Sequence, residues 1–149
     1  MKPTEQTRPL VLIDADVIFA GAAGPTEYGA SLVILRMAEI TLIEAITCQQ
    51  VIGEVERNLI EKMPSALPAL RLLVSRCLKV VPTPTETEID PYQGLAHTKD
   101  LPILVTAIRE GCPMLVTFNQ RHFQPGYPKV EVMLPSEFVQ RVRYLLADL

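Results

Sequence analysis

The stretch LVLIDADVIFA, residues 10–20, decides the fold. Its aliphatic and β-branched residues predict a strand that is buried on both faces, as strands of parallel sheets are. Asp14 follows the first four apolar residues of this run. A carboxylate at that place is hard to explain by structure alone, so Asp14 is the first candidate for a functional residue.

Further along the chain, strand-like apolar runs alternate with segments of helical spacing. We expect further strands at 41–48, 78–84, 112–118 and 130–135, and helices at 31–40, 49–63, 66–77, 101–111 and 136–146. Asp100 and Ser136 are expected helix N-caps, and Gly111 is an expected helix stop. Segments 21–30 and 82–99 are expected to be loops, the second with room for a short helix.

This alternating order predicts an α/β fold. We expect a three-layer α/β/α architecture, in which helices cover a central, mostly parallel sheet of five strands. A chain of 149 residues has the length of one domain. We therefore assign residues 10–146 to a single domain and residues 1–9 to a flexible N-terminal segment.

The composition narrows the class of protein. With 48% hydrophobic and 21% charged residues it is that of an ordinary globular protein, which excludes disorder, collagen-like repeats and a coiled coil. No apolar run reaches the ~18 residues of a membrane span, and the polar start MKPTEQTRP is unlike a signal peptide. A net charge of −3 offers no broad attraction for nucleic acid, so a nucleic-acid enzyme would need local basic groups around an acidic centre.

The number and spacing of the cysteines and histidines indicate the cellular compartment and exclude some kinds of metal site. Cys48, Cys77 and Cys112 are odd in number and scattered, which argues against a disulfide framework and a structural zinc site. A cytoplasmic location is therefore expected. The chain has only two histidines, which excludes a histidine-rich metal site.

Active sites of open parallel sheets form beyond the carboxyl ends of the strands. Six side chains are expected at that edge: Asp14, Asp16, Glu54, Asp100, Thr117 and Asn119. Carboxylates that gather there repel each other unless some are protonated or a cation sits between them. Oxygen ligands favour Mg²⁺ or Mn²⁺, and a divalent ion held by carboxylates suits phosphodiester hydrolysis.

Most of these residues also have a purely structural explanation. Asp16 fits a turn in which its side chain bonds its own backbone, and Asp100 fits a helix N-cap. Glu54 lies off the apolar stripe of its helix, where a solvated glutamate is common. Turn or loop positions are the alternative for the remaining candidates: Thr117, Asn119 and His122.

Taken together, these residues resemble the PIN-domain nuclease family over residues 10–138. The matching blocks are IDADVI at 13–18, VIGEV at 51–55, KDLPILVTAI at 99–108, LVTFNQRHF at 115–123 and VMLPSEF at 132–138. The blocks at 99–108 and 115–123 are the most specific, because their spacing and their flanking apolar residues both agree with the family.

The resemblance implies a ribonuclease that depends on Mg²⁺ or Mn²⁺. It places the family's metal-binding acids on Asp14, Glu54 and Asp100, with Asp16 or Asn119 assisting. We expect supporting roles for Thr117 and His122. Three basic residues in or near the blocks are candidates for contacts with the RNA backbone, with a solvated surface charge as the alternative for each: Arg57, Lys99 and Arg121. Many small members are toxins of type II toxin–antitoxin pairs, so the resemblance also implies a homodimer and an antitoxin partner.

Two positions depart from the family pattern and keep other functions open. Asp16 stands where asparagine or serine is common, and Asn119 is a neutral residue at the fourth acidic position. A PIN-like module that only binds RNA or protein is therefore the second hypothesis. A phosphatase of the haloacid-dehalogenase type would use Asp14 as its nucleophile, but no acidic pair follows strand 112–118. A receiver domain would need an aspartate at the end of strand 78–84, which the sequence lacks.

Overall fold

The computed structural model describes residues 8–24 and 29–147, and its centre is one parallel sheet. The five strands are β1 (Leu10–Ile13), β2 (Glu44–Cys48), β3 (Leu78–Val81), β4 (Met114–Val116) and β5 (Glu131–Met133). They lie in the order β3-β2-β1-β4-β5, and every neighbouring pair is parallel. The predicted five-stranded sheet is confirmed, and it is wholly parallel. β1 lies at its centre, where Val11, Leu12 and Ile13 are fully buried.

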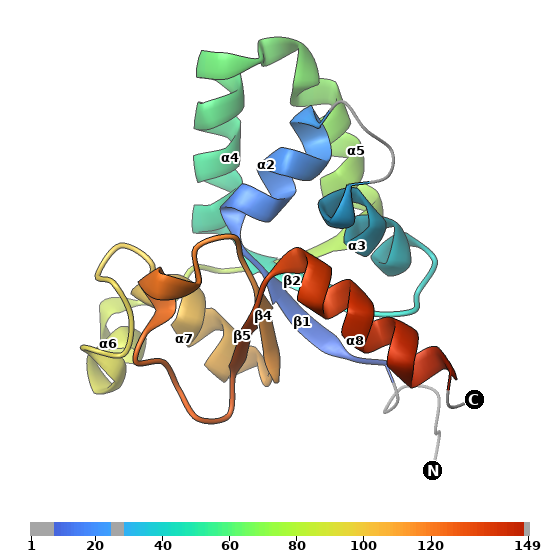
Figure 1. Cartoon of the computed structure of the whole chain (residues 1–149). Coiled ribbons are helices and arrows are strands. Elements are labelled where there is room, and N and C mark those ends of the chain that lie inside the picture. Colours follow the sequence, from blue (N-terminus) through green and yellow to red (C-terminus); the bar gives the residue numbers. More distant parts are fainter. Residues whose placement is uncertain (1–7, 25–28, 148–149) are drawn as a thin grey trace.

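Helices lie on both faces of the sheet and beyond its edge. They are α2 (Ala15–Ala23), α3 (Ala30–Glu39), α4 (Gln49–Lys62), α5 (Leu67–Cys77), α6 (Glu86–Ile89), α7 (Leu101–Glu110) and α8 (Pro135–Ala147), with short 3-10 turns at η1 (Pro64–Ala66), η2 (Asp90–Tyr92) and η3 (Gln120–Phe123). α7 packs on β1, β2 and β4, and α3 packs on β2 and against α8. Figure 1 shows α7 and α8 on opposite sides of the strands, which confirms the three-layer α/β/α fold.

The prediction for residues 15–23 was wrong, because helix α2 replaces the second half of the expected strand and the start of the expected loop; residues 25–28 of that loop lie outside the described residues. Asp14 has an extended backbone, and its side chain accepts the N–H of Ala15, so it caps α2. Short apolar runs fit a strand or a buried helix equally well, and here tertiary packing favours the helix. Gly21 allows α3 to approach, since a Cβ there would lie 2.5 Å from Leu35 Cδ1.

The other expected strands and one cap also need correction. Each strand is shorter than predicted: Thr41 takes a left-handed backbone (φ 64°) before β2, and Pro82 cannot donate to a ladder after β3. Ser136 is not an N-cap, because α8 begins at Pro135 and the Glu137 carboxylate accepts the Leu134 N–H. Gly111 ends α7 in the left-handed conformation as predicted.

Residues 1–7 of the expected flexible segment lie outside the described residues. Of the segment's remainder, Pro9 accepts a hydrogen bond from the Glu44 N–H at 2.9 Å, which attaches it to β2. Within residues 8–24 and 29–147, no helix is long and apolar enough to cross a bilayer.

Candidate active site

Strand register brings the first two site residues together. Ile13 of β1 pairs with Val116 of β4, so the residues that follow each strand leave the sheet side by side. The Asp14 N–H donates to the Val116 carbonyl at 3.0 Å, which continues the ladder by one residue. Asp14 and Thr117 therefore meet at the carboxyl edge, at the point in Figure 1 where β1 runs into α2.

The Asp14 carboxylate is held by two hydrogen bonds in a buried place. Its Oδ1 accepts the Ala15 N–H at 2.7 Å, and its Oδ2 accepts the Thr117 hydroxyl at 2.7 Å. The residue is only 6% exposed, and Thr117 is fully buried. Since a hydroxyl has one proton, Thr117 Oγ1 donates to Asp14 rather than to Asp16 Oδ2, which lies farther away at 3.4 Å.

Asp16 lies two residues after Asp14, in the first turn of α2, and its side chain contacts the loop that follows β4. Its Oδ2 accepts the Phe118 N–H at 3.1 Å and the Asn119 Nδ2 at 3.1 Å. The Asn119 N–H in turn donates to Thr117 Oγ1 at 3.0 Å. Asp16 Oδ1 is buried and has no hydrogen-bond partner within the described part of the chain. An unpartnered carboxylate oxygen in a buried place is costly and points to a group that is bound there.

Asp100 occupies the N-cap position of α7 without acting as a cap. Its backbone is helical and its side chain makes no capping bond. The carboxylate instead lies 3.0 Å from His122 Nδ1, through its Oδ2. The two histidine rings stack at 5.4 Å between centroids, and the His97 N–H donates to the His122 carbonyl at 2.7 Å. Two loops are thereby joined beside Asp100.

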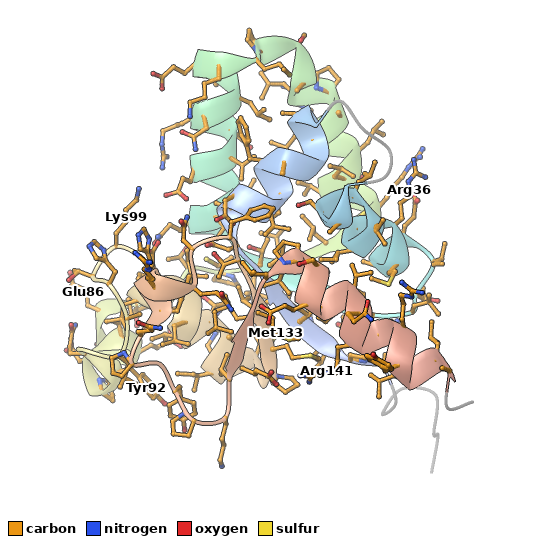
Figure 2. The ribbon with its side chains drawn as sticks, in the orientation of Figure 1. Arg36, Glu86, Tyr92, Lys99, Met133 and Arg141 are labelled. Atoms are coloured by element: carbon orange, nitrogen blue, oxygen red, sulfur yellow. The ribbon has the colours of Figure 1, made fainter. Side chains whose placement is uncertain are left out.

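Glu54 meets this cluster from α4. Its carboxylate forms an ion pair with Lys99 Nζ at 3.4 Å, and the Glu54 side chain is 21% exposed. Gln50, one turn earlier on α4, donates to the Lys99 carbonyl at 3.3 Å. Figure 2 shows Lys99 on the side of the molecule that carries α6 and α7, level with the lower end of α4. Glu54 is therefore partly buried and paired, unlike a freely solvated glutamate.

Burial and repulsion between carboxylates disfavour the ionised forms of Asp14 and Asp16. Burial, followed by the charge of Asp16, raises the pKa of Asp14 from 3.8 to about 7. Burial also raises the pKa of Asp16, although the hydrogen bonds from the loop after β4 oppose it. The negative charge of Asp100 also raises the pKa of both aspartates, so the three carboxylates lie close enough to interact electrostatically.

Comparison with known proteins gives the family. A model of the PIN domain matches residues 10–121, most of the chain. The chain belongs to the PIN-domain family. This membership sets aside the phosphatase and receiver-domain alternatives. A comparison with curated protein sequences finds no significant match.

Two solved structures share the fold of this PIN domain. One is the crystal structure of VapBC2 from Rickettsia felis bound to a DNA fragment from its promoter, with 18% identity, a TM-score of 0.60, and coverage of 84% of this chain and 98% of that one. The other is VapC20 from Mycobacterium tuberculosis, a sarcin–ricin loop cleaving toxin, with 18% identity, a TM-score of 0.57, and coverage of 81% and 98%. At this identity the likeness shows the fold.

The donor set of the PIN domain fits a hard divalent cation. Among the described residues, no three acidic, histidine or cysteine side chains are close enough to form a ready-made metal cluster. Mg²⁺ does not need one, because it usually binds through one or two carboxylates and keeps several waters. Buried Asp14 and half-buried Asp16, whose Oδ1 has no partner among the described residues, supply that minimum.

The three predicted RNA-contacting residues have different surroundings. Arg57 and Arg121 are exposed, on α4 and η3. Arg57 folds back along α4, where its Nη1 would lie 3.4 Å from a Cβ at Gly53. Lys99 is 71% exposed but is paired with Glu54.

Three residues that matter here were missed by the sequence analysis. Gln50 and His97 fix the loop before α7, and Phe118 both donates to Asp16 and presents a half-exposed ring. Only Phe118 carries a sequence signal, since an aromatic between Thr117 and Asn119 falls inside a predicted site. The roles of His97 and Gln50 depend on contacts between distant segments.

Proposed function

We propose that this PIN domain is a ribonuclease that depends on Mg²⁺ or Mn²⁺. The observation that carries the proposal is the pair of buried Asp14 and half-buried Asp16, with raised pKa values and one buried carboxylate oxygen that lacks a partner among the described residues. A bound divalent cation would offset the negative charge of a phosphodiester and supply a stronger water nucleophile. Asp14 and Asp16 would hold it, with Asp100 and Glu54 completing the acidic edge.

The chain's own residues position these carboxylates. Thr117 donates its hydroxyl proton to Asp14 Oδ2, which fixes the orientation of that carboxylate. Asn119 holds Asp16 through its side-chain amide, so in this arrangement its nitrogen donates to a carboxylate. His122 orients Asp100, and Lys99 balances the charge of Glu54. Arg57 and Arg121 would contact RNA phosphates on either side.

A toxin role in a toxin–antitoxin pair is the biological setting that we propose. The support is the likeness to VapBC2 and to VapC20, a toxin that cleaves the sarcin–ricin loop. On this hypothesis the protein acts in the cytoplasm, forms a homodimer and binds an antitoxin partner.

Cleavage of a pool of structured RNAs tests the activity. Wild type and Asp14→Asn are compared with Mn²⁺, with Mg²⁺ and with EDTA. We expect metal-dependent cutting that the variant loses, because the substitution removes the buried one of the two carboxylates that would hold the metal. Full activity in Asp14→Asn would contradict the site assignment.

The second candidate, a module that binds RNA or protein without cutting, is favoured by one contact. Asn119 donates to Asp16, so the fourth acidic position of the family contributes a donor here rather than a carboxylate. Thermal unfolding with and without Mn²⁺ separates the two functions. A working metal site gains stability by linkage, and a site that has lost metal binding does not.

A further inference from the structure

A cavity of about 600 Å³ lies beside the candidate active site. Its walls are mainly apolar and come from α2, the start of α3, the end of α4 and the segments that follow β4 and β5. The residues that define its character are Phe19, Lys62, Met63, Phe118 and Leu134. Its volume falls within the range of about 300–1,000 Å³ that is usual for pockets that bind small organic groups.

Phe118 connects this cavity to the acidic cluster. Its N–H donates to Asp16 Oδ2 at 3.1 Å, while its ring lines the cavity and is 49% exposed. The ring therefore stands one side-chain length from a carboxylate of the proposed metal site. In RNA, a base stands one ribose away from its own phosphate. A phosphate at the acidic cluster would thus bring an adjoining base to the mouth of this cavity.

The chemistry of the lining matches a flat aromatic group that carries a neighbouring negative charge. Two phenylalanine rings, Phe19 and Phe118, line the cavity, and a half-exposed ring such as that of Phe118 serves as a stacking surface for bases. Lys62 is the one cationic side chain among the described residues of the lining, and its Nζ lies 5.7 Å from the centroid of the Phe19 ring. An apolar side chain of a protein partner would make no use of that cation.

We propose that this cavity holds one unpaired nucleobase of the RNA substrate next to the bond that is cut. Phe118 is the stacking surface, and Lys62 contacts a phosphate of the same strand. This inference rests on the proposed ribonuclease function. It makes Phe118 a residue that determines substrate preference, and it requires that the RNA be single-stranded or opened at the cleavage point.

Binding measurements in a non-cleaving background test the proposal without requiring activity. All proteins keep Asp14, Ca²⁺ replaces Mg²⁺ so that the metal site is filled without cleavage, and fluorescence anisotropy gives the Kd for labelled oligomers of A, of C and of U. An abasic ribose-phosphate oligomer of the same length is the base-free probe. Phe118→Ala is compared with Phe118→Tyr, which keeps a ring. Tyr144→Ala is the matched control, because Tyr144 is 65% exposed on α8 and does not line the cavity.

We expect Phe118→Ala to weaken binding of at least one base-containing oligomer by about 5- to 150-fold, the value of one base–aromatic stack. Binding of the abasic oligomer should not change, and Phe118→Tyr should restore the base-dependent part. Tyr144→Ala should leave every Kd unchanged. If Phe118→Ala alters all oligomers equally or none of them, the proposal is overturned.

Two further readouts separate this proposal from its alternatives. If Phe118→Ala converts a dimer to a monomer in light scattering and leaves RNA binding unchanged, the cavity is a contact between copies of the chain and the proposal is wrong. If wild type fails to cut any RNA in the cleavage assay while the base-dependent binding is as expected, the ribonuclease function fails and the base pocket stands.

Discussion

Replacing Asp14 by asparagine should stabilise the metal-free protein, and the gain should grow with pH. Burial raises the pKa of this carboxyl to about 7, so the folded protein holds a proton that the unfolded chain has already released. Between roughly pH 4 and pH 7 the folded state therefore binds more protons than the unfolded state. Stability is lost as the pH rises through this window, and asparagine has no such proton to lose.

The magnitude follows from the two pKa values. The difference between about 7 and 3.8 corresponds to about 4 kcal/mol of lost stability once the pH exceeds 7. Because Asp14 is only 6% exposed, solvent does little to reduce this penalty. At pH 5 about 2 kcal/mol of it is already present, so about 3 kcal/mol separates pH 5 from pH 8. For a protein of this size that is a shift in Tm of about 5–10 °C.

Asparagine can keep the hydrogen bonds of the carboxylate. Its Oδ1 still accepts the Ala15 N–H, and its Nδ2 can donate to Thr117 Oγ1. The Thr117 hydroxyl then turns its proton toward Asp16 Oδ2, which lies 3.4 Å away. The substitution therefore removes a charge while it keeps both of these hydrogen bonds, and the change of stability with pH reports the charge.

The assay is thermal unfolding at pH 5 and pH 8 in EDTA, followed by addition of Mn²⁺ at pH 8. Asp90→Asn is the control, since Asp90 is exposed in η2. Between pH 5 and pH 8, the Tm of wild type and of the control should fall further than the Tm of Asp14→Asn. Addition of Mn²⁺ should raise the Tm of wild type and of the control but not that of Asp14→Asn. Parallel losses in wild type and Asp14→Asn would refute the charge argument, and equal gains with Mn²⁺ would refute the metal site.

Three further experiments test other parts of the site. Thr117→Val should lower the free energy of unfolding by about 1–3 kcal/mol, measured in urea, because it leaves buried partners of its hydroxyl unpaired. Lys99→Met should change stability by less than about 1 kcal/mol, since Lys99 is 71% exposed, but it should tighten Mn²⁺ binding in calorimetry by freeing Glu54. Asp16→Asn and Asn119→Asp should each slow RNA cleavage, and the double variant should recover rate relative to either single one, because their hydrogen bond can run in the opposite direction.

The sequence predicts the centre of the site because that centre depends on strands. Asp14 and Thr117 each follow a buried strand, and parallel pairing alone is enough to bring them to one edge. Asp16 and Asn119 lie two residues beyond, so they arrive with them. Strand identity and the carboxyl-edge rule therefore place these four residues without any detail of side-chain packing.

The surroundings of the site do not follow from local pattern. α2 begins directly after Asp14 because Asp14 caps it. The apolar residues that follow Asp14 fit a strand equally well, so their pattern alone does not predict the helix. The pairing of Asp100 with His122 depends on how the loop before α7 meets the loop after β4. Glu54 is paired with Lys99 for the same reason. These contacts join segments that no spacing rule relates.

The way each acid is partnered indicates where a cation is needed. Glu54 lies against a lysine and Asp100 against a histidine, so both have a basic side chain beside them. Asp14 and Asp16 have only neutral donors, namely backbone N–H groups, a hydroxyl and an amide. Asp16 and Asn119 are the two departures from the family pattern, and a hydrogen bond joins their side chains. The extra negative charge of Asp16 therefore lies beside the neutral residue at the fourth acidic position. The uncompensated charge of the site is therefore concentrated on Asp14 and Asp16, and a divalent ion gains most by binding there.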